Sequence, residues 1–203
     1  MSQTPARAIV VDPYPLFVHA IQTSLDRVHI AVLRQYHTLD ELTSELDKLK
    51  PDLLIVGPHF GENCLVACRE TNRRCPSVKI ILFTVHADEP LFQADAAYAG
   101  VAACVFPILT DEQFLADVQK VLAGQQFFSH EILALAFQPI ELTARECTVL
   151  NLMAEGKSDR QIADTLNDAK TSTVRNHSQH ILEKLQVHRR EQAVWRARHR
   201  GLI

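Results

Sequence analysis

The sequence lacks the features that mark several large classes of protein. Its 203 residues contain six glycines and a single tryptophan, and they form no glycine-rich loop of the kind that cradles phosphates. No apolar run approaches the roughly 20 residues of a membrane-spanning helix, and no basic N-terminal stretch leads into the apolar core of a secretory signal. We therefore expect a globular, cytoplasmic protein that does not enter the membrane.

The five cysteines do not form a pattern that predicts a disulfide framework. Their number is odd and most of them lie in apolar stretches, which favours reduced, buried thiols. Cys64, Cys68 and Cys75 offer an alternative as a metal or thiol-sensing site, but no histidine stands at a standard zinc spacing from them. With no nucleophile paired to a base either, we expect neither an enzyme nor a bound cofactor or metal.

Charge is distributed unevenly along the chain. The net charge is −3, yet residues 1–138 carry 10 Lys and Arg against 16 Asp and Glu, whereas residues 139–203 carry 11 against 8 and four histidines. A positive C-terminal part is compatible with a module that binds phosphates, joined to an acidic domain.

The first 124 residues alternate short apolar runs with amphipathic segments, which is typical of repeated βα units. Thr38-x-x-Glu41 and Thr110-x-x-Gln113 are capping boxes that open two of the helices, and Gly124 ends the last one. We predict an α/β doubly wound domain with a five-stranded parallel sheet. The expected strands are Ala8–Val11, Ile30–Arg34, Leu53–Val56, Lys79–Phe83 and Ala103–Phe106.

Residues 125–138 are predicted to connect two domains through a short helix that ends before Pro139. From residue 139 to 203 the pattern is helical, so we expect an all-α domain of four helices. Thr143-x-x-Glu146 opens the first, which ends near Gly156, and Ser158-x-x-Gln161 opens the second, which ends near Asn167. The third and fourth are expected over residues 172–185 and 190–198.

Two short helices followed by a longer one can place the longer helix in the major groove of DNA. In the third helix the apolar side is formed by Val174, Ile181, Leu182 and Leu185. Its polar side carries Arg175, Asn176 and Gln179. Asn and Gln can bond to both polar atoms of an adenine edge and Arg to those of guanine, so this side has the chemistry that base recognition needs.

Five short motifs follow one another in register along residues 140–203. They are Leu142-Thr143-x-Arg145-Glu146, Ala154-x-Gly156-x-x-x-x-Gln161-Ile162-Ala163, Thr173-Val174-Arg175-x-His177, Ile181-Leu182-x-Lys184-Leu185-x-Val187, and Ala193-Val194 with a Gly201-Leu202-Ile203 ending. Together they resemble the LuxR-type helix-turn-helix of NarL/FixJ-like response regulators.

The resemblance implies a double-stranded DNA partner and a set of contact residues. It puts Arg175, Asn176 and Gln179 where the family touches DNA, with His177 and Lys184 as backbone contacts and Thr173 as a phosphate contact. The chain departs from the family at two positions. Lys170 cannot cap with an oxygen, so we expect the helix to start one residue late, at a Thr171 or Ser172 cap; Gln186 replaces the usual glycine and must adopt whatever backbone that position demands.

The order of the N-terminal units, with Pro15-Leu16-Phe17, Lys50-Pro51-Asp52, Thr84 and Ala99-Gly100, resembles a receiver domain over residues 7–123. Receiver chemistry needs an acid pair, a nucleophilic carboxylate and a lysine. By this resemblance only Asp12 and Thr84 remain in that pocket. Pro13 replaces the second acid, Gly57 the nucleophile and Pro107 the lysine, while Cys104 takes the place of a switch aromatic residue.

Because glycine has no group to phosphorylate, we expect a pseudo-receiver that is not phosphorylated on aspartate. Asp52 is one candidate substitute, but it precedes the strand and should lie far from the pocket. The leading hypothesis is a sequence-specific transcription regulator, an atypical member of the two-component systems, that binds two half-sites as a homodimer. The alternative is an interaction module whose receiver-like domain binds a partner protein or a small ligand, with weak or vestigial DNA binding.

Overall fold

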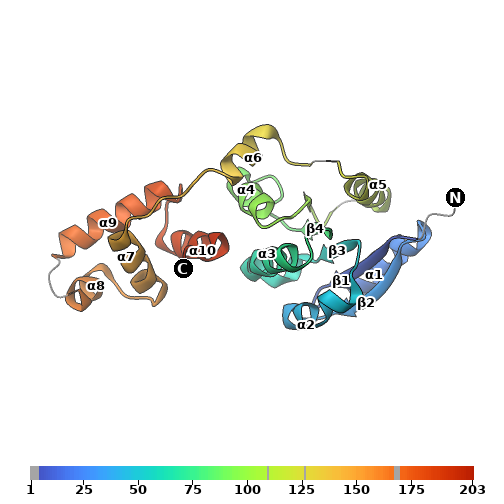
Figure 1. Cartoon of the computed structure of the whole chain (residues 1–203), viewed down its shortest axis with the longest axis horizontal. Coiled ribbons are helices and arrows are strands. Elements are labelled where there is room, and N and C mark those ends of the chain that lie inside the picture. The colour runs from blue at the N-terminus through green and yellow to red at the C-terminus, as the bar shows by residue number, and fades with distance from the viewer. Residues whose placement is uncertain (1–4, 109, 126, 167–169) are drawn as a thin grey trace. The chain divides into compact units, whose positions relative to one another are not determined.

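The computed structural model describes residues 5–108, 110–125, 127–166 and 170–203. Contacts between residues divide the chain after Phe137 into two compact units, one built on a sheet and one helical (Figure 1). In the part of the chain that is described, no helix combines the length and apolar character needed to cross a bilayer.

The first unit contains the predicted doubly wound sheet. Its five strands are all parallel and lie in the order β2-β1-β3-β4-β5. The third and fourth strands match their predicted bounds, whereas β2 begins and ends later than expected and β5 stops one residue sooner. The strands are β1 (Arg7–Val11), β2 (Ala31–Tyr36), β3 (Leu53–Val56), β4 (Lys79–Phe83) and β5 (Ala103–Val105).

Helices cover both faces of this sheet, which explains why β3 is an unbroken run of apolar residues. On one face, Ala8 and Val10 of β1 belong to a core that also contains side chains of α1 and α5. Ile9 and Val11 point to the other face and are equally buried. The helical segments are α1 (Pro15–Arg27), α2 (Leu39–Leu49), the 3-10 helix η1 (Pro58–Asn63), α3 (Cys64–Arg74), α4 (Pro90–Tyr98) and α5 (Asp111–Leu122). The helix η1 was not predicted from the sequence.

The four predicted capping boxes are present. Thr38, Thr110, Thr143 and Ser158 each accept a hydrogen bond from the backbone three residues on, and the Glu or Gln there bonds back. Gly124 follows the end of α5 with a left-handed φ of 78°. Local sequence therefore sets where these helices begin and where α5 ends.

The short helix expected in the connector is α6 (His130–Ala136), capped by the Ser129 side chain. It packs against α4 and so belongs to the first unit. The Tyr98 and Phe137 rings lie 6.3 Å apart beside it.

The second unit consists of α7 (Ala144–Ala154), α8 (Asp159–Thr165), α9 (Thr171–Lys184) and α10 (Arg190–Arg200). One prediction about α9 is wrong: the helix starts at Thr171, and its N-cap is Lys170, which makes no side-chain cap bond. Packing of Val174 against the core holds this end of the helix without an oxygen cap. The predicted end of α8 near Asn167 lies outside the described residues, as do Asp168 and Ala169 of the turn.

Gln186 follows the end of α9 with a φ of 54°, in the left-handed region. This is the backbone conformation that glycine adopts most readily. In this conformation a residue with a side chain loses roughly 1–2 kcal/mol of folding stability. Glycine avoids that loss, but it raises the conformational entropy of the unfolded chain, which offsets part of the gain. We expect Gln186→Gly to stabilise the protein by about 0.5–1 kcal/mol, measured by urea unfolding. Gln186→Ala keeps the strained backbone and should give no such gain; equal stabilisation by both variants would contradict the explanation.

Candidate functional site

Helix α9 has one buried side and one exposed side. Val174, Ile181 and Leu185 at its end are fully buried, and the helix packs on α7 and α8. Asn176 and Gln179 lie on the opposite side and are exposed, because positions three or four apart share a face of a helix. The apolar side predicted from the sequence is the one that packs, although Leu182 is only half-buried.

The predicted base contacts and backbone contacts of α9 are accessible to different degrees. Arg175, Asn176, Gln179 and Thr173 are exposed, and His177 is half-buried. The Gln179 Nε2 atom donates a hydrogen bond to Glu183 Oε1 at 3.2 Å. None of the three predicted base-contacting side chains is covered by the interior of its own domain.

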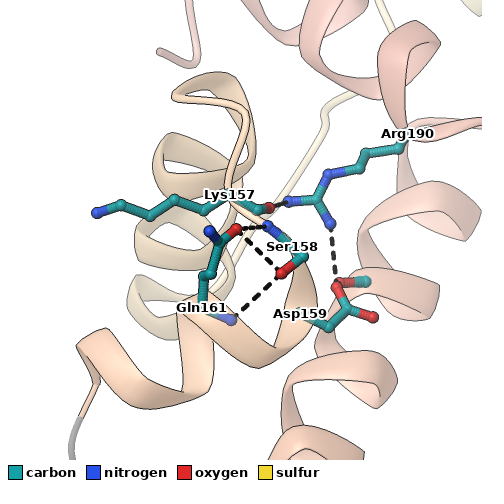
Figure 2. A network of polar contacts seen from close by, with 6 residues as sticks. Lys157, Ser158, Asp159, Gln161 and Arg190 are labelled. Carbon is teal, nitrogen blue, oxygen red and sulfur yellow. Dashed lines mark hydrogen bonds and ion pairs between the residues drawn. The ribbon is translucent and has the colours of Figure 1, made fainter.

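A polar network holds α8, α9 and α10 together (Figure 2). Arg190 of α10 donates to the Asp159 carboxylate at 3.0 Å and also to the carbonyl oxygen of Lys157. The Ser178 hydroxyl on α9 donates to the same carboxylate at 3.2 Å. Asp159 is the first residue of α8, directly after the Ser158 cap. The network therefore fixes the start of α8 against the middle of α9, which sets the angle at which α9 is presented.

Lys184, a predicted DNA backbone contact, is also bound inside the domain. Its ammonium lies 2.8 Å from Oε2 of Glu146, a residue that is only 3% exposed. The backbone N–H of Thr143 donates to the same oxygen at 2.8 Å. Burial alone would raise the pKa of Glu146, but the hydrogen bonds from Lys184 and Thr143 outweigh it and lower that pKa below its usual value. Lys184 thus ties the end of α9 to the start of α7.

In the first unit, the residues assigned to the receiver-like pocket follow the carboxyl ends of the strands. Asp12 comes after β1, Gly57 after β3, Thr84 after β4 and Pro107 after β5. Asp12 is fully buried. Its carboxylate accepts hydrogen bonds from the Tyr14 backbone at 2.8 Å, the His59 backbone at 3.4 Å and His59 Nδ1 at 2.8 Å. Three donors therefore surround the acid predicted for this pocket.

The Asp12 side chain occupies the space beside Gly57 in which another residue would carry its side chain. A Cβ atom added to Gly57 would lie 2.6 Å from Asp12 Cγ and 2.7 Å from Asp12 Cβ, and closer still to Oδ2. These separations are far below van der Waals contact. Asp12 and a nucleophilic side chain at position 57 therefore cannot both be present in this arrangement.

The other pocket positions provide no acid or lysine. Thr84 Oγ1 accepts a hydrogen bond from the His86 backbone at 3.1 Å, while Pro13 and Pro107 are exposed. Asp52 accepts from the Arg7 backbone at 2.8 Å, at the opposite, amino-terminal end of the strands, as expected. Between 5–108, 110–125, 127–166 and 170–203, no cluster of three or more His, Cys, Asp or Glu side chains is arranged to hold a metal ion.

The cysteines of α3 are structural. Cys64 and Cys68 are buried. Burial raises the pKa of Cys64 to about 12 and that of Cys68 well above its usual value. Since the thiolate is the reactive form, neither thiol suits a redox sensor.

Residues 141–197 match the family model described as bacterial regulatory proteins of the luxR family. The transcriptional regulatory protein DesR of Bacillus subtilis (strain 168) is 33% identical over 156 residues, which cover 76% of this chain and 76% of DesR. The chain belongs to the NarL/FixJ-type response regulators. It is a DNA-binding transcriptional regulator of that family, which consists of transcription factors and not of enzymes.

Solved structures agree on the fold of this response regulator. RcsB from Salmonella enterica serovar Typhimurium, bound to promoter P1flhDC in the presence of the phosphomimetic BeF3−, superposes with a TM-score of 0.73 at 20% identity, covering 97% of this chain and 99% of that one. A structure of two RcsB dimers bound to two parallel DNAs gives 0.66 at 20% identity, covering 94% and 96%. At this identity the likeness concerns the fold.

Sequence reasoning missed three features of the regulator. His59 gave no signal, because its bond to Asp12 joins residues 47 apart. The Arg190–Asp159 pair was also not predicted, because its two residues lie far apart in the sequence. Glu183, four residues after Gln179, was within reach of helical spacing and could have been found.

Proposed function

We propose that this response regulator binds specific DNA sequences through α9 and works without phosphorylation on aspartate. The observation that carries the first part is the exposed polar side of α9, on which Arg175, Asn176 and Gln179 stand free of the domain core. Arg can pair with guanine and Asn or Gln with adenine, and each well-placed pair contributes about 1–3 kcal/mol of discrimination. Thr173, His177 and Lys184 complete the proposed contact set as backbone contacts.

A homodimer is the proposed binding form. RcsB dimers on DNA have been solved, and two copies of a helix-turn-helix read two half-sites one helical turn apart. We expect the footprint on DNA to contain an inverted or direct repeat. Sedimentation of the protein with a selected duplex tests this, since a stoichiometry of one chain per duplex would contradict a dimer.

Replacing Arg175 by Ala should lower affinity for the selected site about 5- to 100-fold and relax preference at a single base pair. The measurement is competitive gel shift of single-base variants of that site. Arg198→Ala is the matched control, because this arginine is exposed on α10. If both substitutions weakened all sites equally, α9 would not be reading bases. If the wild-type protein bound no DNA fragment in the presence of nonspecific competitor DNA, the proposal of sequence-specific binding would fail.

Lys184 needs a separate readout because it also pairs with Glu146. A phosphate contact adds about 0.9 to the slope of log affinity against log salt. Lys184→Met should therefore lower the slope by about one if the ammonium touches a phosphate, whereas a purely internal role leaves the slope unchanged.

The absence of aspartate phosphorylation rests on Gly57 and on the enclosure of Asp12. A glycine cannot accept a phosphoryl group, and Asp12 already accepts from three donors. We expect no change in intact mass after incubation with acetyl phosphate and Mg²⁺. A gain of roughly 80 Da, the mass of one phosphoryl group, that hydroxylamine removes would overturn this part of the proposal.

A second candidate function, docking of a protein partner on the receiver-like domain, is favoured by exposed apolar side chains. Tyr14, Leu16, Val85 and Ile108 are all exposed. They lie in or next to the connections that follow β1, β4 and β5, the end of the sheet where the pocket is. Large apolar side chains gathered at one end of the sheet favour a protein contact. If this end binds a partner, substituting Leu16 and Ile108 by Ser should abolish regulation in cells while leaving DNA affinity unchanged.

A further inference from the structure

Helix α9 contains a single acidic residue, Glu183, and it lies on the exposed side. With 3.6 residues per turn, Glu183 falls on the same face as Asn176 and Gln179, directly opposite Val174. All three polar residues are exposed and Val174 is fully buried. A carboxylate therefore stands within the face proposed to enter the groove, where phosphates surround it with like charge.

The carboxylate is bonded to a proposed base-reading residue. Gln179 Nε2 donates to Glu183 Oε1 at 3.2 Å, so one N–H of the amide is directed toward the C-terminal end of α9. Within the described part of the chain, nothing bonds the other N–H or the Oε1 atom of Gln179, so both can meet a base. This bond selects one of the two flipped orientations of the amide, which makes Glu183 a positioning residue for Gln179.

An ionised carboxylate can only accept hydrogen bonds. In the major groove, the donors are the amino groups of adenine and cytosine, whereas guanine presents the acceptors N7 and O6. We infer that Glu183 is a specificity determinant that disfavours guanine, and favours an amino-bearing base, at the base pair under the C-terminal half of α9. The inference rests on the proposed function of α9.

The same charge should weaken binding to DNA of any sequence. Repulsion between Glu183 and phosphates lowers nonspecific affinity, and a bond to an amino group offsets that repulsion at the correct site alone. Discrimination through a repulsive element is a general route to specificity. A residue that merely supported the helix through its four-residue spacing would affect stability and leave base preference unchanged.

The test compares full-length wild type, Glu183→Gln and Glu183→Ala in selection from a randomised duplex library. Glu191→Gln is the matched control, since it removes the same charge from an exposed position on α10. We expect wild type to exclude guanine at one base pair, and both Glu183 variants to lose about fivefold of that discrimination. They should also bind a nonspecific duplex about two- to threefold more tightly, while Glu191→Gln retains the guanine exclusion.

The outcomes separate the inference from the function on which it rests. If wild type selects a site and the Glu183 variants select it with the same guanine discrimination, the inference fails and the proposed function stands. If the variants lose base preference at every position equally, Glu183 stabilises the helix without recognising a base, and this result also overturns the inference. If wild type selects no site, both proposals fall together.

Discussion

Gly57→Ala is expected to destabilise the protein by about 3 kcal/mol, although the change adds a single methyl group. The new Cβ would lie 2.6 Å from Asp12 Cγ and 2.7 Å from Asp12 Cβ, so Asp12 or the backbone must move. Overpacking of this kind costs about 1–3 kcal/mol. Moving Asp12 also breaks bonds from Tyr14 and His59, which leaves a buried carboxylate short of donors. Urea unfolding of both proteins measures the loss.

A double-mutant cycle distinguishes this contact from a general intolerance at position 57. Asp12→Ala removes the atoms that the new methyl group meets, so Gly57→Ala should cost much less in that background. We expect a coupling free energy of about 2 kcal/mol. Strictly additive effects would show that the carboxylate does not fill the space beside Gly57. By the same geometry, we expect Gly57→Asp alone to give no phosphorylation by acetyl phosphate, because the introduced side chain would meet Asp12.

The sheet and its helices could be predicted because their signals are local. Buried parallel strands such as Leu53–Val56 are continuous apolar runs, and Thr143 and Ser158 carry their own capping partners three residues away. The prediction that the domain lacks a nucleophile likewise depends on one residue, Gly57. These features depend on short stretches of chain whose chemistry allows few alternatives.

The arrangement around Asp12 could not be predicted, because it depends on a contact between distant residues. The resemblance predicts an acidic pocket residue at position 12, but the direction of its side chain depends on a hydrogen bond with His59, which lies 47 residues away. The ion pair of Lys184 could not be predicted for the same reason. Its place in a helix-turn-helix motif indicates a DNA contact, whereas the buried carboxylate that it meets is 38 residues away, in a residue recognised only as part of a capping box.

Lys184→Met should lower the free energy of unfolding by about 2 kcal/mol at pH 7. The substitution leaves Glu146, buried at the start of α7, without its cation. Breaking a buried pair costs up to about 3–5 kcal/mol, and we expect less here because the Lys184 side chain is 38% exposed and the Thr143 hydrogen bond remains. Lys157→Met is the control: Lys157 pairs with the exposed Glu155, and its loss should cost at most about 0.5 kcal/mol.

The dependence of this effect on pH follows from the lowered pKa of Glu146. A carboxylate whose pKa is lower in the folded state stabilises the fold above its unfolded value, about 4.3, and that contribution is lost as the pH falls through the folded value. Without the ammonium, the pKa of the buried Glu146 rises, so the variant protonates it earlier and loses less on acidification. The difference between wild type and Lys184→Met should therefore shrink from pH 7 to pH 3. A constant difference over that range would mean that Lys184 acts by packing its alkyl chain and not by its charge.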